Sequence, residues 1–454
     1  MLLNAWLGCT GAPVEPGTPE PQAPREVPWS GELPALGREV RGTTEARAVV
    51  HLHSPWSHDA CDGMPLLDGA TEGSGTVNEP CLADLRAGLC ATRFDFAFVT
   101  DHPAWAAFQP YEALPHVRPG DEALGNANRI HCPDGHEVVW SPGIEDELMP
   151  VGLDRHVSLD PLENDRLYNA YDAEAVTEDR AAGAAVFVAH TESRVDADLE
   201  RLQDAGITGV ELFNLHAMFD PDIREEHLGL DGLGWTLDIA PFTSPSGAAE
   251  PDLFVLGVLA AQGPSLAHWD HLLARGPAVG VAGTDAHQNV LPIDLRDGDR
   301  GDSYRRMLRW FSNVLRVEVP GSPESAQAAL EAGRSYVVFD VLGTSDGFDF
   351  THSTDAGDVV EMGGAGGAGT LTVGCPTLHP DAPKGPEAPQ IDVTVLKDGV
   401  PWHVGCGEVA TDGPGVYRVE VVMTPYHLRP FLGDDPEPFL RPYPWIYANA
   451  IRVQ

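Results

Sequence analysis

Residues 48–59 read AVVHLHSPWSHD, and this stretch decides the predicted fold. The apolar run before His51 is typical of a buried strand, and the Pro-containing polar run after His53 is typical of a loop. Alternate residues of a strand face the same side, so His51 and His53 can bind one metal ion from the end of that strand. The stretch therefore predicts a strand that ends in metal ligands.

Further apolar runs of strand length follow at intervals along the chain. With the first they cover residues 48–53, 94–100, 137–140, 184–189, 210–213, 278–282 and 314–319. Helical patterns separate several of them, at 81–93, 173–182, 196–205, 268–275 and 303–312. Short apolar strands that alternate with helices predict a parallel sheet. Seven such units predict an α/β fold, a (β/α)7 barrel of the TIM type with one unit missing.

The pattern of apolar residues changes after a further predicted helix at 324–333. From residue 335, short alternating runs are interrupted by Gly and Pro, which is typical of an antiparallel β domain of sandwich size. We therefore expect a barrel domain over 41–334 and a C-terminal β domain over 335–454.

The first 40 residues read as a leader and a tether. A short apolar stretch runs into Gly8-Cys9, and a Pro-rich segment follows. This resembles a bacterial lipoprotein leader and predicts export, with a lipid anchor on Cys9 at the periplasmic or cell surface. The alternative is an ordinary N-terminus with a chance cysteine.

Cysteine usage also favours an oxidising compartment. Of the seven cysteines, six remain once Cys9 is set aside, four in the first large domain and two in the last. An even number in each domain predicts disulfides. Cys375–Cys406 is the simplest pairing, and the other four allow three connectivities between which the sequence does not choose.

Composition excludes several classes of function. The net charge of −41 argues against a nucleic-acid groove and against direct contact with an anionic membrane surface. No apolar run approaches the ~18–20 residues of a membrane span. The 18 histidines, many of them beside Asp or Glu, point to metal binding.

Polar residues follow almost every predicted strand. After the first strand come His51, His53 and His58; later strands are followed by Asp101-His102, Glu145 with His156 beyond it, His190, Asn214, and Asp285 with His287. In a parallel barrel these strand ends meet on one face, where active sites lie. Any one histidine is more often structural, but six strand ends that agree in chemistry predict a shared metal centre.

The ordered set HxH, TDH, GIE, a downstream His, AH and TDAH resembles the polymerase-and-histidinol-phosphatase (PHP) superfamily over 51–287. The resemblance implies three divalent ions, Zn, Mn or Fe. It implies that the first is held by His51, His53, Glu145 and Asp285, the second by Glu145, His156 and His190, and the third by His58, His102 and His287. The usual first motif has an Asp as ligand; here His58 has the ligand spacing and Asp59 is its neighbour. The tail, with ALEAGRSYV at 329–337, is similar to the carbaryl-hydrolase-like (CehA/McbA) branch.

This ligand set predicts a hydrolase. Two ions that share Glu145 can acidify a bridging water, and the resulting hydroxide attacks phosphorus or a carbonyl carbon without a protein nucleophile. We expect a phosphoesterase with a small-molecule substrate, in which Asp101 orients His102 or carries a proton and Arg194, with Glu192, binds the leaving group or phosphate. For Glu192 and Arg194 an ordinary loop salt bridge is the alternative.

Two other functions stay open. The first is a carboxyl-ester or carbamate hydrolase, which would use the same metal site. The second is a surface lipoprotein that binds metal or glycan and keeps the barrel fold without catalysis. A PHP nuclease is disfavoured because the acidic chain would repel DNA.

Overall fold

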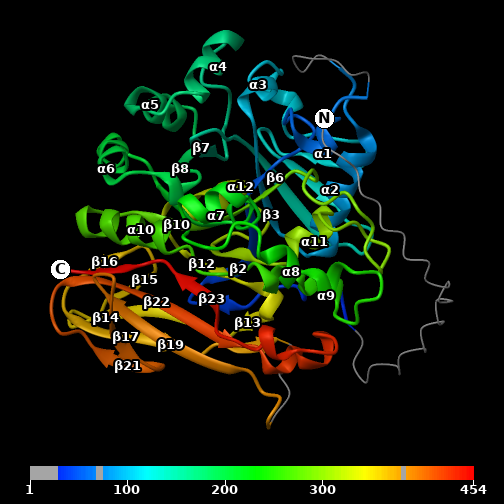
Figure 1. The fold of residues 1–454 in the computed structure, drawn as a ribbon. Coiled ribbons are helices and arrows are strands. Elements are labelled where there is room, and N and C mark those ends of the chain that lie inside the picture. Colours follow the sequence, from blue (N-terminus) through cyan, green and yellow to red (C-terminus); the bar gives the residue numbers. More distant parts are fainter. Residues whose placement is uncertain (1–28, 68–74, 380–384) are drawn as a thin grey trace, which may run out of the picture.

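The computed structural model describes residues 29–67, 75–379 and 385–454 (Figure 1). The predicted lipoprotein leader, with Cys9, lies outside the described residues. Among those described, no helix combines the length and apolar character needed to cross a membrane.

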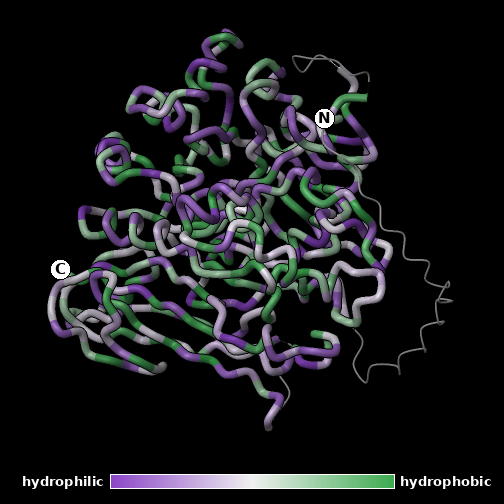
Figure 2. The backbone as a smooth tube through the Cα atoms, in the orientation of Figure 1, coloured by the Kyte–Doolittle hydropathy of each residue, from purple (hydrophilic) through white to green (hydrophobic). Residues whose placement is uncertain are grey.

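A ladder of six parallel strands forms the centre of the molecule, as predicted. Its neighbours pair in the order β6 (Glu137–Ile144), β3 (Phe96–Asp101), β2 (Thr43–Leu52), β10 (Val279–Ala286), β9 (Gly209–Asn214) and β8 (Ala185–Val188). Nearly every residue of these strands is buried, which explains their continuous apolar runs. Figure 2 shows apolar residues gathered along this centre.

The seventh predicted strand is present but not parallel, so that part of the prediction was wrong. β11 (Ser312–Val317) runs antiparallel to β2 and pairs with its first half, whereas β10 pairs with its second half at Val50 and Leu52. β2 is ten residues long, so two strands share one of its edges. At the other end of the ladder, β7 (Leu148–Val151) pairs antiparallel with β8.

β7 also lies against β6, because the Leu153 N–H donates to Pro142 O at 2.9 Å. This contact brings the two ends of the ladder together. A closed seven-stranded barrel is not among the strand pairings of the described residues, and it stays a prediction. The remaining strands of this part are β1 (Glu39–Val40), β4 (Glu122–Ala123) and β5 (Asn128–His131).

Helices cover the ladder on both sides (Figure 1). They are α1 (Ala60–Gly63), α2 (Glu79–Ala91), α3 (Pro103–Ala106), α4 (Pro161–Tyr168), α5 (Ala173–Ala181), α6 (Asp196–Ala205), α7 (Pro221–Glu226), α8 (Trp235–Asp238), α9 (Ala240–Thr243), α10 (Gly263–Arg275), α11 (Tyr304–Leu308) and α12 (Pro323–Glu331). Local chemistry sets their ends: the Asp172 carboxylate accepts hydrogen bonds from the first turn of α5, and Gly206, at φ 102°, ends α6.

The antiparallel strands predicted after residue 335 are present. One sheet runs through β20 (Val400–Val404), β19 (Gln390–Lys397), β22 (Gly415–Thr424), β23 (Tyr443–Ala448) and β12 (Ser335–Val338), and β24 (Ile451–Val453) joins β22 and β16 (Ala365–Gly366). A second contains β15 (Val359–Glu361), β14 (Asp349–Thr354), β17 (Gly369–Gly374) and β21 (Gly407–Ala410), and β13 (Thr344–Asp346) pairs with β18 (Thr377–His379). Because β12 also pairs with β11, the hydrogen-bonded ladder is continuous across residue 335.

Three disulfides link the six described cysteines. Cys375–Cys406 joins the loops of the C-terminal domain, as predicted. Among the connectivities left open, the structure has Cys61–Cys81 and Cys90–Cys132. Both of these hold α2: one to the loop that follows His58, the other to the hairpin before β6.

Candidate metal centre

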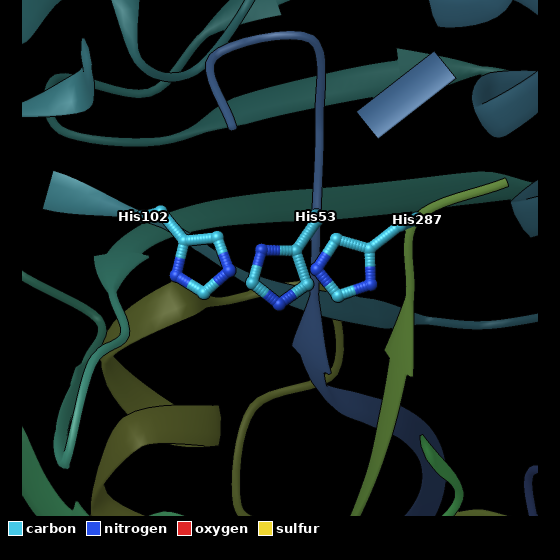
Figure 3. Close-up of side chains that lie close together, drawn as sticks. All are labelled: His53, His102 and His287. Atoms are coloured by element: carbon cyan, nitrogen blue, oxygen red, sulfur yellow. The ribbon is translucent and has the colours of Figure 1, made fainter. Parts of the chain in front are cut away.

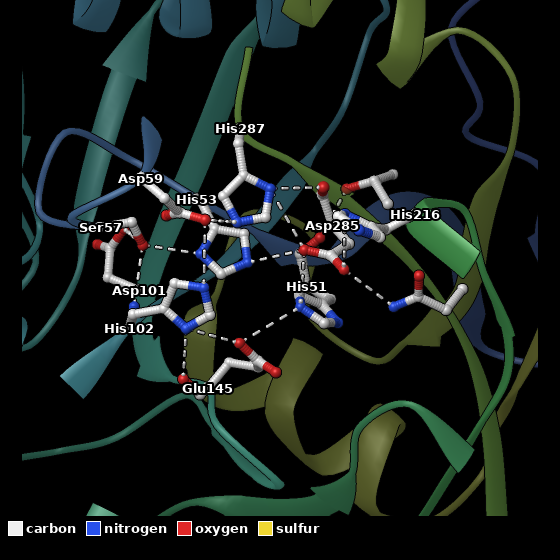
Figure 4. A network of polar contacts seen from close by, with 12 residues as sticks. His51, His53, Ser57, Asp59, Asp101, His102, Glu145, His216, Asp285 and His287 are labelled. Atoms are coloured by element: carbon white, nitrogen blue, oxygen red, sulfur yellow. Dashed lines mark hydrogen bonds and ion pairs between the residues drawn. The ribbon is translucent and has the colours of Figure 1, made fainter. Parts of the chain in front are cut away.

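The predicted ligands at the strand ends meet in one place. His51 and His53 come from the end of β2, Asp101 and His102 from the end of β3, and Asp285 and His287 from the end of β10. Glu145 follows β6 and His190 follows β8. Most of these side chains are buried, and His102 and His190 keep about a fifth to a quarter of their surface exposed. Side chains scattered over more than two hundred positions therefore form one cluster (Figure 4).

Within this cluster, four groups of three side chains have ligand atoms within 4.8 Å of one another. They are His53, His102 and His287; His51, Glu145 and His190; His51, His53 and Asp285; and His216, Asp285 and His287. Atoms that share one ion at about 2.1 Å lie about 3.0–3.4 Å apart. The observed separations are close to this: Asp285 Oδ1 lies 3.3 Å from His51 Nε2 and 3.2 Å from His53 Nε2.

The rings of His102, His53 and His287 lie side by side (Figure 3). The His53 ring is 4.6 Å from that of His102 and 3.8 Å from that of His287, between centroids. Burial, together with the charge of His287, lowers the pKa of His53 to about 3. His53 is therefore neutral at neutral pH, which is the form in which imidazole binds a metal.

Glu145 lies between His51, His102 and His190. Its Oε2 is 3.0 Å from His102 Nδ1 and 3.8 Å from His51 Nε2, and its Oε1 is 3.6 Å from His190 Nε2. Burial alone would raise the pKa of this carboxyl, but the facing histidines lower it to about 2. An ionised carboxylate with its two oxygens turned to different histidines suits the bridging position predicted for it.

Several polar atoms of the cluster are buried without a hydrogen bond. In the described part of the chain these include Nε2 of His51, His53 and His287, and Oε2 of Glu145. Buried polar atoms are nearly always satisfied, so a group of them facing one another needs a partner from outside the chain. Imidazole nitrogens and carboxylate oxygens together suit a divalent cation such as Zn²⁺, Mn²⁺ or Fe²⁺.

Three of these residues hold an unfavourable backbone conformation. His51, His190 and Asp285 have φ of 59°, 50° and 48°, which lies in the left-handed region. Each such residue costs about 1–2 kcal/mol, and this strain is found mostly at functional sites. The turn at each strand end aims the side chain into the cluster.

Two predicted ligands lie outside the four groups. Both ring nitrogens of His156 are hydrogen-bonded elsewhere, Nε2 with Gln109 O at 2.9 Å and Nδ1 with Tyr168 Oη at 3.2 Å. The exposed His58 ring lies 5.2 Å from that of His102. Asp59, its neighbour, instead faces the cluster, with Oδ2 3.2 Å from His287 Nε2 and 3.6 Å from His102 Nε2. At the first motif the structure thus turns the Asp, not the His, toward the cluster, although Asp59 too lies outside the four groups.

Asp101 acts through two serines and not on the His102 ring. Its carboxylate accepts hydrogen bonds from Ser54 N at 2.6 Å, Ser54 Oγ at 2.7 Å and Ser57 Oγ at 3.2 Å. Ser57 Oγ also accepts the His102 N–H at 2.9 Å and lies 2.8 Å from His53 Nδ1. Because the single Ser57 proton goes to Asp101, His53 must donate from Nδ1, which leaves its Nε2 free to bind a metal.

Glu211 is a functional side chain for which the sequence predicted no role. Its Oε1 lies 2.6 Å from His51 Nδ1, and its Oε2 accepts the His190 N–H at 2.8 Å. It thereby directs His51 Nε2 toward the cluster. A Cβ at Gly283 would overlap Glu211 Oε1, so this contact requires glycine at that position. The signal in the sequence is a charged residue inside a fully buried strand.

Arg194 has the contacts of a loop salt bridge. Its guanidinium donates to Ala189 O at 3.2 Å and pairs with Glu147 Oε1 at 3.1 Å. Glu192 is buried, with Oε1 3.5 Å from His190 Nδ1. The Arg194 contacts match the loop salt bridge given as the alternative, whereas Glu192 faces the predicted ligand His190. The catalytic role of both residues stays a prediction.

Comparison with known proteins adds two distant structural similarities. A two-domain protein from Bacteroides vulgatus that contains a predicted PHP-like metal-dependent phosphoesterase aligns with 93% of this chain and 99% of its own, at 12% identity and a TM-score of 0.35. PsfC from Pseudomonas syringae aligns over 65% of this chain and 91% of its own, at 14% identity and a TM-score of 0.36. No family model and no curated protein matches. At these TM-scores neither similarity assigns an activity to the chain.

Proposed function

We propose that this protein is a metal-dependent hydrolase of the PHP type that acts on small phosphoesters. The observation that carries the proposal is the set of nitrogen and oxygen atoms that face one another at 3.0–3.8 Å, several of them buried without a hydrogen bond. A cluster of this kind needs cations to offset its desolvation. The resemblance of the strand-end motifs to the PHP superfamily supports the same assignment.

The donor set divides naturally among three divalent ions. His51, His53 and Asp285 would hold one, His190 a second that shares Glu145, and His102, His287 and Asp59 a third. When bound, such ions acidify water and stabilise negative charge on the oxygens of the scissile group.

The chain itself supplies orientation. Glu211 fixes the His51 ring, and Asp101 with Ser57 fixes the His53 ring, so both present Nε2 inward. His102, His190 and Asp59 are partly exposed, which supports an approach for substrate on their side of the cluster.

The test is a substrate screen on protein of known metal content. The chain is stripped with a chelator, reloaded with Zn²⁺, Mn²⁺ or Fe²⁺, and assayed on naphthyl phosphate, a phosphodiester and naphthyl carbamate. We expect turnover of a phosphoester that disappears on stripping and returns on reloading. Turnover of the carbamate alone would move the assignment to the carbaryl-hydrolase-like chemistry. A fully loaded protein that is inert on the whole panel would contradict a hydrolase.

We also propose that the protein is exported and held at a membrane by lipid on Cys9. Three disulfides among the described cysteines support an oxidising compartment. Mass spectrometry of the N-terminus of the mature protein would test it: an unmodified Cys9 in a chain that starts at Met1 would contradict it.

A further inference from the structure

We propose that His216 is a metal ligand of the cluster and takes the place that the sequence assigned to His156. This inference rests on the proposed metal-dependent function. It concerns which loop completes the site: the loop after β9, which carries His216, or the loop after β7, which carries His156.

His156 is held away from the cluster by its own neighbours. Gln109 O can only accept, so His156 Nε2 carries the proton of that 2.9 Å hydrogen bond. Nδ1 is then left to accept from the Tyr168 hydroxyl at 3.2 Å. The ring also contacts Tyr111 and Tyr168 edge to face or tilted. A neutral histidine with both nitrogens used is a packing residue.

His216 faces the cluster instead. Its Nδ1 lies 3.9 Å from Asp285 Oδ2, and its ring centroid is 6.4 Å from those of His190 and His287. Figure 4 shows it beside Asp285, on the side opposite His53. His216, Asp285 and His287 form one of the four groups with ligand atoms within 4.8 Å.

The loop that carries His216 is fixed by hydrogen bonds to the cluster. The Asn214 amide donates to Asp285 Oδ2 and Glu211 Oε2, both at 3.3 Å, and its carbonyl Oδ1 accepts the Ala217 N–H at 3.1 Å. The Leu215 N–H donates to Gly283 O at 3.1 Å. His216 therefore lies in the short helical turn His216–Met218, next to residues that are hydrogen-bonded to β10.

The two oxygens of Asp285 face different sets of nitrogens. Oδ1 faces His51 and His53, whereas Oδ2 faces His190 Nε2 at 3.5 Å and His216 Nδ1. His216 Nε2 lies 4.0 Å from Asp220 Oδ2, so a carboxylate stands near its second ring nitrogen. The His216 side chain is 37% exposed, so an ion it binds would lie on the solvent side of the cluster.

The test compares Zn²⁺ binding by four forms of the full chain. Wild type, His216→Ala, His156→Ala and His227→Ala are stripped with a chelator, titrated with Zn²⁺ by calorimetry, and their bound zinc counted by elemental analysis. His227 is an exposed histidine at the end of α7 and serves as the matched control. Circular dichroism of the stripped forms checks that each is folded.

We expect His216→Ala to lose one zinc, or to bind it at least ~10-fold more weakly, because loss of even an outer partner of a ligand costs about that much. His156→Ala and His227→Ala should titrate like wild type. A wild-type titration by His216→Ala, or loss of zinc in His156→Ala, would overturn the inference while leaving the proposed function intact. A wild-type chain that binds no zinc, manganese or iron would overturn both.

Discussion

Two buried clusters in this molecule offset the cost of burying carboxylates in different ways. The Asp252 cluster, defined by Asp252, Asp297, Asp299, Arg305, Arg306 and Arg309, lies around α11. Arg306 is fully buried, and all three of its nitrogens donate, to Asp252, to Asp297 and to backbone oxygens. The metal-centre cluster at the strand ends pairs carboxylates with histidines and leaves several ring nitrogens without hydrogen bonds.

The difference shows how a buried polar cluster that only stabilises the fold can be told apart from one that binds a cation. Arginine brings fixed charge and several donors, so it can satisfy carboxylates completely by itself. Neutral histidine offers a lone pair, which a carboxylate cannot satisfy. The metal-centre cluster is therefore incomplete without a cation, whereas each carboxylate of the Asp252 cluster is paired with an arginine.

The largest effect should come from the shared carboxylate of the metal-centre cluster. Glu145→Gln removes the negative charge that faces His51, His102 and His190, and we expect activity on the phosphoester to fall about 10³-fold or more, with loss of at least one ion. Steady-state kinetics with elemental analysis measures both. Glu147→Gln, an exposed neighbour paired with Arg194, is the control and should keep its ions. Full metal content in Glu145→Gln would contradict the bridging position.

Breaking the Asp252 cluster should affect stability and not metal. Asp252→Ala removes the buried carboxylate that Arg305 and Arg306 share and leaves Arg306 paired only with partly exposed carboxylates, which we expect to cost about 3–5 kcal/mol of unfolding free energy. Urea unfolding measures the loss, and zinc content per folded chain should stay at the wild-type value. The exposed Asp346→Ala is the control. A variant that unfolds like wild type, or that loses zinc while folded, would erase the distinction between the clusters.

A change in hydrogen-bond direction should weaken the metal site without removing a ligand. In Asp101→Asn the carbonyl oxygen stays on the Ser54 N–H and the negative charge is lost, so the side chain holds the Ser57 proton less strongly. The Ser57 proton then turns to His53 Nδ1, and the ring proton moves to Nε2. We expect zinc binding to weaken about 10–100-fold. Nitrogen NMR of the stripped protein would report the changed tautomer of His53. Ser57→Ala, which removes the link itself, should also weaken binding; unchanged affinity in both variants would refute the link.

The smallest effect should appear only in acid. Burial alone would raise the pKa of Asp252, but Arg305, Arg306 and Arg309 lower it to about 2, below its ordinary value of 3.8. Asp252 therefore stabilises the fold fully above about pH 4, and this contribution of about 2 kcal/mol is lost as pH falls through about 2. The difference in unfolding free energy between wild type and Asp252→Asn should shrink over that range. A difference that does not change with pH would contradict the arginine pairing.

The strand-end pattern was the part of the site that could be predicted. Apolar runs fixed where the strands lie, and residues such as His51, His53 and Asp285 were placed by their position just after those runs. Parallel strands bring their ends to one edge, so these contacts follow from strand geometry alone. The antiparallel course of β11 could not be foreseen, because the run at 314–319 carries no mark of direction.

Loop residues escaped prediction for a physical reason. Spacing along a loop does not fix where its side chains point, so the sequence assigned His58 and His156, whereas Asp59 and His216 face the cluster in the structure. Glu211 was missed because its partner, His51, lies 160 residues away. Only the packed structure decides such pairs.

By itself, then, the sequence determined the acidic composition, the order of strands and helices, and the ligand chemistry at the strand ends, since these depend on residue type and local period. The tertiary structure decided the two disulfide partners of α2, the hydrogen-bond direction through Ser57 and the loop histidine that faces Asp285. Those features depend on which distant segments touch, and contact between distant segments is set by packing of the whole chain and not by any local pattern.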